Sequence, residues 1–191
     1  ETLHESSASL NVSMLANVGI VDGVSTVEPT INFKKNRKLH VPIIVYHGIR
    51  ATKDSDPESI RKYNTSPELL DQELSYLSQE GYITISPKDV LMFEKNPKIM
   101  PEKVVMISFD DGWRTHYTKA LPLLQKYNMT ATFYVYTNII DKGSFLAWSD
   151  VADLSDAGMT IGAHTLSHPF LTKIDPMVAE KEISESKKVL E

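Results

Sequence analysis

The sequence predicts an α/β fold with a parallel sheet and helices packed outside it. Short, almost wholly apolar runs alternate with helical patterns from Leu39 onward, as expected for buried strands joined by crossover helices. The helical stretches begin at Ser-Pro or Asp-Pro pairs or at a serine, and glycines end two of them; these are common start and stop signals. Five strand-helix units within 191 residues predict a barrel that is begun but not closed.

The predicted strands are short and rich in apolar residues. They comprise residues 41–46, 82–85, 104–109, 130–136 and 159–163. The first of them is almost free of polar residues, which is typical of a strand buried on both faces.

The predicted helices follow these strands. Ser66-Pro67 opens a helix whose buried face is expected to hold Leu69, Leu70, Leu74 and Leu77, and Gly81 ends it. The other helices are expected at residues 87–94 after Ser86, at 117–127, from a Ser149 cap to Gly158, and from Asp175-Pro176 to Glu191.

The first 38 residues differ from the rest of the chain. They are rich in Ser, Asn, Thr and Val and lack a helical period, which predicts a linker or loosely ordered arm before a domain at residues 39–191. The basic cluster at residues 34–38 is interpreted as a solvated part of that linker, with contact to an anionic cell wall or membrane surface as the alternative.

Composition excludes several classes of function. The net charge of −5 argues against a nucleic-acid partner, because a phosphate backbone requires a basic face. The chain has no cysteine, which excludes disulfides, cysteine-ligated zinc and a thiol nucleophile. It has no apolar run of the ~20 residues that span a bilayer. Because it begins with Glu1, we expect that any signal peptide or anchor was removed before this point.

Residues that bind metals or carry protons follow three of the predicted strands. His47 ends the first strand, Asp110 and Asp111 end the third, and His164 ends the last with His168 four positions later. The carboxyl ends of parallel strands form one edge of the sheet, where ligands collect. These side chains are therefore expected to lie together.

The histidine pair and the aspartate pair each allow a structural interpretation when taken alone. His164 and His168 could share a metal or could each bond to backbone groups. Asp110 and Asp111 could cap a turn or helix. Together, two imidazoles and one carboxylate form a metal-ligand set with open positions. Since adjacent residues of an extended segment point in different directions, the other aspartate would be free to act as a general base.

Residues 39–191 resemble the polysaccharide deacetylase (NodB-homology, carbohydrate esterase family 4) domain. The resemblance is carried by the segments Ser108-Phe109-Asp110-Asp111-Gly112 and His164-Thr165-Leu166-Ser167-His168-Pro169. It implies a distorted (β/α) barrel with Asp110 as catalytic base. It further implies that Asp111, His164 and His168 bind a divalent metal: zinc first, with cobalt, nickel or manganese as alternatives.

A narrower resemblance concerns the first strand. Residues 41–49 look like the opening strand of the circularly permuted branch that deacetylates poly-N-acetylglucosamine in biofilms. This resemblance implies that His47 is the general acid, and an imidazole titrates in the useful pH range. The groove motif with Pro-Tyr that usually follows the histidine motif is absent before Glu191, so we expect a domain truncated at its C-terminus.

The aromatic residues allow two interpretations. Tyr134 and Tyr136, within a predicted strand, are expected in the core, whereas Trp113 and Trp148 could line a sugar groove or pack in the core. His116 is expected on the surface.

The predicted function is a secreted or cell-surface, metal-dependent hydrolase that removes N-acetyl groups from an N-acetylglucosamine polysaccharide of an exopolysaccharide or cell wall. One alternative is a non-catalytic carbohydrate-binding module on the same fold. A second is a cytosolic metal-dependent amidase that acts on a small molecule. A serine esterase is disfavoured because the chain has no G-x-S-x-G segment. The oligomeric state is not predicted.

Overall fold

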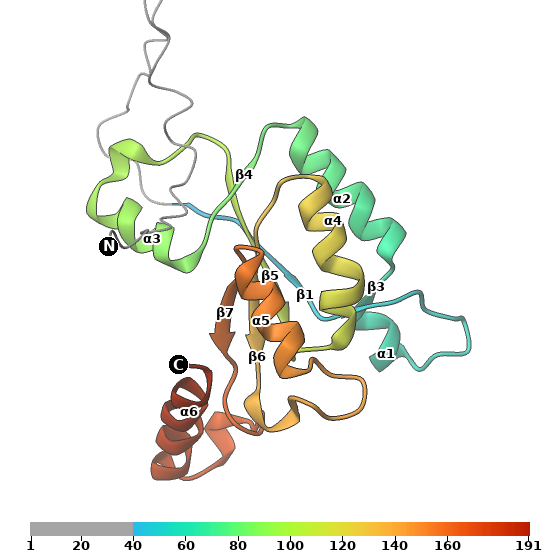
Figure 1. The fold of residues 1–191 in the computed structure, drawn as a ribbon, viewed down its shortest axis with the longest axis vertical. Helices are drawn as coiled ribbons and strands as arrows, with labels where there is room; N and C mark the ends of the chain where they lie inside the picture. Colours follow the sequence, from blue (N-terminus) through green and yellow to red (C-terminus); the bar gives the residue numbers. More distant parts are fainter. Residues whose placement is uncertain (1–39) are drawn as a thin grey trace, which may run out of the picture. The chain divides into compact units, whose positions relative to one another are not determined.

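The structure is a computed structural model that describes residues 40–191 (Figure 1). The arm predicted at residues 1–38 lies outside the described residues, so the domain boundary stays a prediction. The strands are β1 (Ile43–Tyr46), β2 (Gly48–Ile49), β3 (Asn64–Thr65), β4 (Ile83–Thr84), β5 (Val104–Asp110), β6 (Thr132–Val135) and β7 (Thr160–Ala163). The α-helices are α1 (Glu58–Lys62), α2 (Pro67–Gln79), α3 (Pro87–Lys95), α4 (Leu121–Lys126), α5 (Trp148–Asp156) and α6 (Pro176–Leu190).

A parallel sheet forms the centre of the described domain. Its strands follow the order β1-β5-β6-β7, and β4 pairs with the first residues of β5. The predicted α/β class with a parallel sheet is confirmed. Within residues 40–191 the sheet is open, with β1 and β7 at its two edges, so closure into a barrel stays a prediction.

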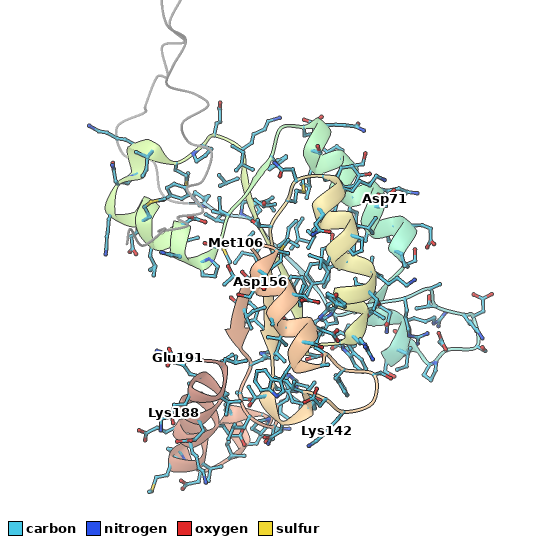
Figure 2. The ribbon with its side chains drawn as sticks, in the orientation of Figure 1. Asp71, Met106, Lys142, Asp156, Lys188 and Glu191 are labelled. Carbon is cyan, nitrogen blue, oxygen red and sulfur yellow. The ribbon has the colours of Figure 1, made fainter. Side chains whose placement is uncertain are left out.

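The two faces of the sheet are covered differently. On one face, Phe109 of β5 and Phe133 of β6 are fully buried against leucines of α2, α4 and α5. On the other face, Met106 packs near the start of β5 with Phe93 of α3 in a smaller core. Figure 2 shows Met106 in the interior of the domain, whereas Asp71 and Asp156 lie on helices outside it. Asp110 ends β5 on the less covered face, because side chains alternate along a strand.

Most predicted helix starts are confirmed by local hydrogen bonds. Ser66 accepts from Leu69 N, Ser86 accepts from Asp89 N, and Asp175 accepts from Met177 N, as N-cap residues do. The Ser149 cap is wrong: α5 begins at Trp148, and Asp150 accepts a bond from Ala147 N at 2.9 Å. That carboxylate satisfies a free N–H of the first turn in place of a serine cap.

Two burial predictions are wrong. Leu69 of α2 is 46% exposed, whereas the other three leucines of the predicted face are buried. Strand β1 is not buried on both faces, because Ile43 and Val45 are 57% and 51% exposed. Both side chains lie on an edge strand, at a part of the sheet that the helices of the described domain leave open.

The helix predicted at 117–127 is divided in two. It begins as a π-helix at His116–Ala120 and continues as α4. Such single π turns often occur at functional sites. The elements α1, β2 and β3 were not predicted, and β2 and β3 contain only two residues each. None of the helices in residues 40–191 is long and apolar enough to cross a lipid bilayer.

Gly112 is required by two local constraints. Its φ is +73°, and a Cβ there would lie 2.7 Å from Cγ1 of the buried Val135. We expect Gly112→Ala to lower the free energy of unfolding by about 1–2 kcal/mol for the left-handed backbone and by about 1–3 kcal/mol more for the clash. Gly81 is the matched control, because it has the same φ and open space around it.

Chemical denaturation of the two alanine variants separates these contributions. Gly81→Ala carries only the backbone cost, so Gly112→Ala should unfold at a clearly lower denaturant concentration. Equal midpoints would show that Val135 does not restrict the turn after Asp111.

Candidate metal and catalytic centre

Side chains that follow two strand ends converge beside the less covered face of the sheet. Asp111 follows β5, and His164 follows β7, where its N–H bonds to Val135 O at 3.0 Å. His168 reaches the same point from the loop that His164 begins. One ligand atom from each of these three side chains lies within 4.8 Å of the others. The structure therefore brings together the three residues that the sequence nominated as metal ligands.

The three atoms form a compact triangle. His164 Nε2 and His168 Nε2 are 3.1 Å apart, and they lie 3.7 Å and 3.5 Å from Asp111 Oδ1. Zinc–nitrogen bonds of about 2.0–2.1 Å in a tetrahedron give ligand–ligand separations of roughly 3.3–3.4 Å. The measured separations lie on both sides of this value, so the triangle has the size that a small divalent cation requires.

The polar atoms of the triangle also fit a cation in their chemistry. Asp111 Oδ1 is buried and has no hydrogen-bond donor. At 3.1 Å, the two facing imidazole nitrogens would repel each other if both carried a lone pair. Burial lowers the pKa of His164, with the neighbouring carboxylates opposing this effect. This histidine is therefore neutral at neutral pH, as a metal ligand must be.

Strained backbone occurs at two of the candidate metal ligands and between the two histidines. Asp111 and His168 have φ values of 77° and 60°, and Thr165 between the two histidines has 68°. Non-glycine residues rarely adopt this region, and those that do gather at functional sites. The loop from His164 to His168 must therefore be held in place by contacts around it.

Trp113 donates a hydrogen bond to the second oxygen of Asp111. Its Nε1 donates to Asp111 Oδ2 at 3.3 Å, and its ring stacks on Phe145 with centroids 4.5 Å apart. The Phe145 loop is joined to this turn by a bond from Leu146 N to Gly112 O at 2.9 Å. Asp111 is thus oriented by the indole on one oxygen, which leaves the other to face the histidines. Trp148, by contrast, is 42% exposed at the start of α5.

Asp110 lies beside the triangle with a free oxygen. Its Oδ1 is buried and without a hydrogen-bond partner. Burial raises the pKa of Asp110, although positive charge on His164 and His47 would lower it. An unpaired carboxylate with a raised pKa is a stronger base than an exposed one. Asp110 has the surroundings that a general base needs.

His47 stands at the end of the neighbouring strand. The register pairs Tyr46 with Phe109, so the next residues of the two strands, His47 and Asp110, lie at adjacent strand ends. The two side chains are close enough for their charges to interact. The His47 ring packs against Tyr63, with centroids 5.0 Å apart. The arrangement is consistent with a proton donor on the opposite side of Asp110 from β6.

Sequence and structure comparisons identify the family of this chain. The sequence profile of polysaccharide deacetylases matches residues 98–191. The solved structure of the deacetylase PplD from Streptococcus pyogenes, in complex with acetate, is 32% identical. It has a TM-score of 0.71 over 78% of this chain and 67% of PplD. The chain belongs to the polysaccharide deacetylase family.

Curated relatives of this polysaccharide deacetylase chain are longer than it is. YxkH of Bacillus subtilis is 29% identical over 83% of this chain and 54% of its own length. The poly-beta-1,6-N-acetyl-D-glucosamine N-deacetylase of Staphylococcus aureus is 26% identical over 71% of this chain and 48% of its own length. The chain thus spans about half the length of these relatives. The predicted family is confirmed.

The position predicted for His116 is wrong. It is fully buried at the start of the π-helix, where its ring packs against Phe109 and Phe133. Its Nε2 lies 2.6 Å from the carbonyl oxygen of His47, to which it donates, and its Nδ1 has no partner. His116 therefore ties the end of β1 to the segment that follows the aspartate pair. The residues around His116 in the sequence form no pattern that predicts this burial.

Burial makes His116 a source of acid sensitivity. Desolvation lowers its pKa to about 4 from an ordinary value of 6.5, despite the bond to His47. Below pH 6.5, His116 is protonated in the unfolded chain but stays neutral in the folded protein. The free energy of unfolding therefore falls between pH 6.5 and about pH 4. The loss attributable to His116 is on the order of 3 kcal/mol. Denaturant unfolding at intervals from pH 7 to pH 4 measures it.

His116→Gln is the companion variant for this prediction. Glutamine keeps a donor for the His47 carbonyl but does not titrate. The variant should be less stable at pH 7 yet lose less stability on acidification. If both proteins show the same slope between pH 6.5 and pH 4, His116 is not the responsible group.

Two tyrosines predicted in the core face the centre instead. Tyr134 and Tyr136 are both half-buried. Their rings lie beside the histidines, with centroid distances of 6.4 Å from Tyr134 to His164 and 5.3 Å from Tyr136 to His168. Burial and the charges of Asp110 and Asp111 raise the pKa of each, so both remain neutral phenols. The alternation along β6 turns Tyr134 toward the same face as Asp110.

Proposed function

We propose that this chain contains the metal and catalytic centre of a hydrolase that removes N-acetyl groups from an N-acetylglucosamine polysaccharide and releases acetate. The observation that supports it is the convergence of Asp111, His164 and His168 beside the unpaired carboxylate of Asp110. Asp111, His164 and His168 would hold the metal, for which zinc suits the size and the ligand types. When bound, such a cation polarises a carbonyl oxygen and acidifies water.

Asp110 and His47 carry the two proton transfers in this proposal. Water attacks the acetyl carbon while Asp110 accepts its proton. The C–N bond then breaks, and His47 gives a proton to the departing nitrogen, which leaves as the amine of a glucosamine unit. The two groups come from adjacent strand ends, so a substrate amide between them could meet both. Trp113 and Gly112 keep Asp111 oriented throughout.

The polymer is proposed to be poly-N-acetylglucosamine of an exopolysaccharide, with cell-wall polymers as the alternative. Support comes from the Staphylococcus aureus relative, whose name states that it acts on poly-beta-1,6-N-acetyl-D-glucosamine. Such polymers lie outside the cell, and we therefore propose an extracellular or cell-surface location. Fractionation of the producing cells, with detection of the chain in the surface or medium fraction, tests the location.

Acetate release tests the activity. The purified protein is loaded with Zn²⁺, Co²⁺, Ni²⁺ or Mn²⁺ and given oligomers of poly-β-1,6-N-acetylglucosamine, chitin and peptidoglycan. We expect acetate from at least one polymer in the loaded protein and none after chelation. Binding of an oligomer by a metal-loaded protein that releases no acetate would favour the carbohydrate-binding alternative.

A further inference from the structure

One residue of helix α6, Glu182, makes the hydrogen bonds to the loop that bears the two histidines. The carboxylate of Glu182 accepts from Leu166 N at 2.9 Å and Ser167 N at 2.8 Å through Oε2, and from Ser167 Oγ at 2.7 Å through Oε1. The carbonyl oxygen of Glu182 also lies 3.1 Å from Leu166 N. Figure 1 shows α6 beside the segment that follows β7. The bonds thus reach the middle of the segment between His164 and His168.

The other hydrogen bonds of this loop leave two of its N–H groups without an acceptor. Leu166 O and Thr165 O accept bonds from Asn138 and Thr137, and His168 N bonds to Thr165 Oγ1. These bonds use two carbonyl oxygens and the N–H group of His168, but not the N–H groups of Leu166 and Ser167. Among the described residues, Glu182 alone accepts hydrogen bonds from the N–H groups of Leu166 and Ser167 and from Ser167 Oγ. Since Thr165 and His168 have left-handed backbones, the loop would relax without a partner for these groups.

Glu182 is negatively charged at neutral pH while it accepts the hydrogen bonds of the loop. Burial raises its pKa, but the bonds from Ser167 and Leu166 and the charge of Lys181 bring it below its ordinary value. Charge-assisted bonds from backbone N–H groups are stronger than neutral ones. The carboxylate therefore gives the loop a firm support at neutral pH.

We propose that Glu182 is a positioning residue of the metal centre, because its carboxylate fixes the His164–His168 loop so that both Nε2 atoms face Asp111. The inference rests on the proposed function only in taking these three residues to bind a metal. Outer-shell partners of metal ligands typically change affinity by about 10–100-fold when they are removed. Glu182 acts one step further out, through the backbone of the loop instead of through a ligand side chain.

Metal affinity of the purified chain, measured by chelator competition, tests the proposal. We expect Glu182→Ala to bind Zn²⁺ about 10–100-fold more weakly and to change the visible absorption of the Co²⁺ form. Glu182→Gln should recover most of the affinity, because its amide oxygen can still accept from the loop. Glu185→Gln is the matched control on the same helix, where the carboxylate pairs with Lys188 at 2.7 Å.

Several outcomes separate this inference from the proposed function. If the unmodified chain binds no metal, both are overturned. If it binds metal and Glu182→Ala binds it as tightly as the Glu185 control, the inference alone is overturned. Should Glu182→Ala not fold, Ser167→Ala removes one bond from the loop and should weaken affinity by roughly two- to tenfold. Unchanged affinity in that variant would equally contradict the role of Glu182.

Discussion

Replacing Asp110 with asparagine is expected to lower kcat for acetate release by about 10²–10⁴-fold, the usual range for loss of general acid–base catalysis. Asparagine has the same shape but cannot accept the proton of the attacking water. Asp110 is the base in the proposed mechanism because its Oδ1 is buried, has no hydrogen-bond partner and adjoins the triangle of candidate ligands. Burial also raises its pKa, which strengthens it as a base. Initial rates over a range of substrate concentrations measure the change.

Metal content distinguishes a lost base from a damaged centre. The Asp110→Asn protein should still bind one equivalent of metal, since its three proposed ligands are untouched. Asp156→Asn, on the outer helix α5 (Figure 2), is the control and should keep full activity. Normal turnover by Asp110→Asn at full metal occupancy would show that another group accepts the proton.

The position of the centre could be predicted from the sequence because it depends only on the direction in which the strands run. Parallel strands present their carboxyl ends at one edge, so Asp111 and His164 were expected to meet once β5 and β7 were recognised. The structure brings them together. Helix starts such as Ser66 and Ser86 were also correct, because a cap depends on residues three or four positions apart.

The errors concern properties that depend on distant neighbours. His116 is buried because it packs against Phe109 and Phe133 in the core, and Val45 is exposed because it lies on an edge strand. Neither fact can be read from local periodicity. Glu182 was overlooked for the same reason: it is one of several acidic residues on an amphipathic helix. Its partners lie 15 and 16 positions earlier in the chain.

Alanine at His164, His168 or Asp111 is expected to weaken metal binding by roughly 10²–10³-fold, since about 10–16 kcal/mol for a structural zinc site, shared among its four ligands, is about 2.5–4 kcal/mol each. Each change removes one corner of a triangle with sides of 3.1–3.7 Å. The two remaining donors cannot enclose the cation. Calorimetric titration of the metal-free protein with Zn²⁺ gives the affinity and the stoichiometry. His40→Ala, an exposed residue before β1, is the control and should bind like the unmodified chain.

The metal affinity of the unmodified chain should also depend on pH. Because burial lowers the pKa of His164, protons compete with metal at this residue only below its ordinary pKa of about 6.5. The unmodified chain should therefore keep its affinity from pH 8 to pH 7 and lose it on further acidification.

One of the three ligand variants should differ from the others in its fluorescence. Asp111→Ala also releases the indole of Trp113, which should change tryptophan fluorescence in that variant alone. Retention of full zinc affinity by Asp111→Ala would mean that the carboxylate is not a ligand, and the convergence of these strand ends would then need a different chemical explanation.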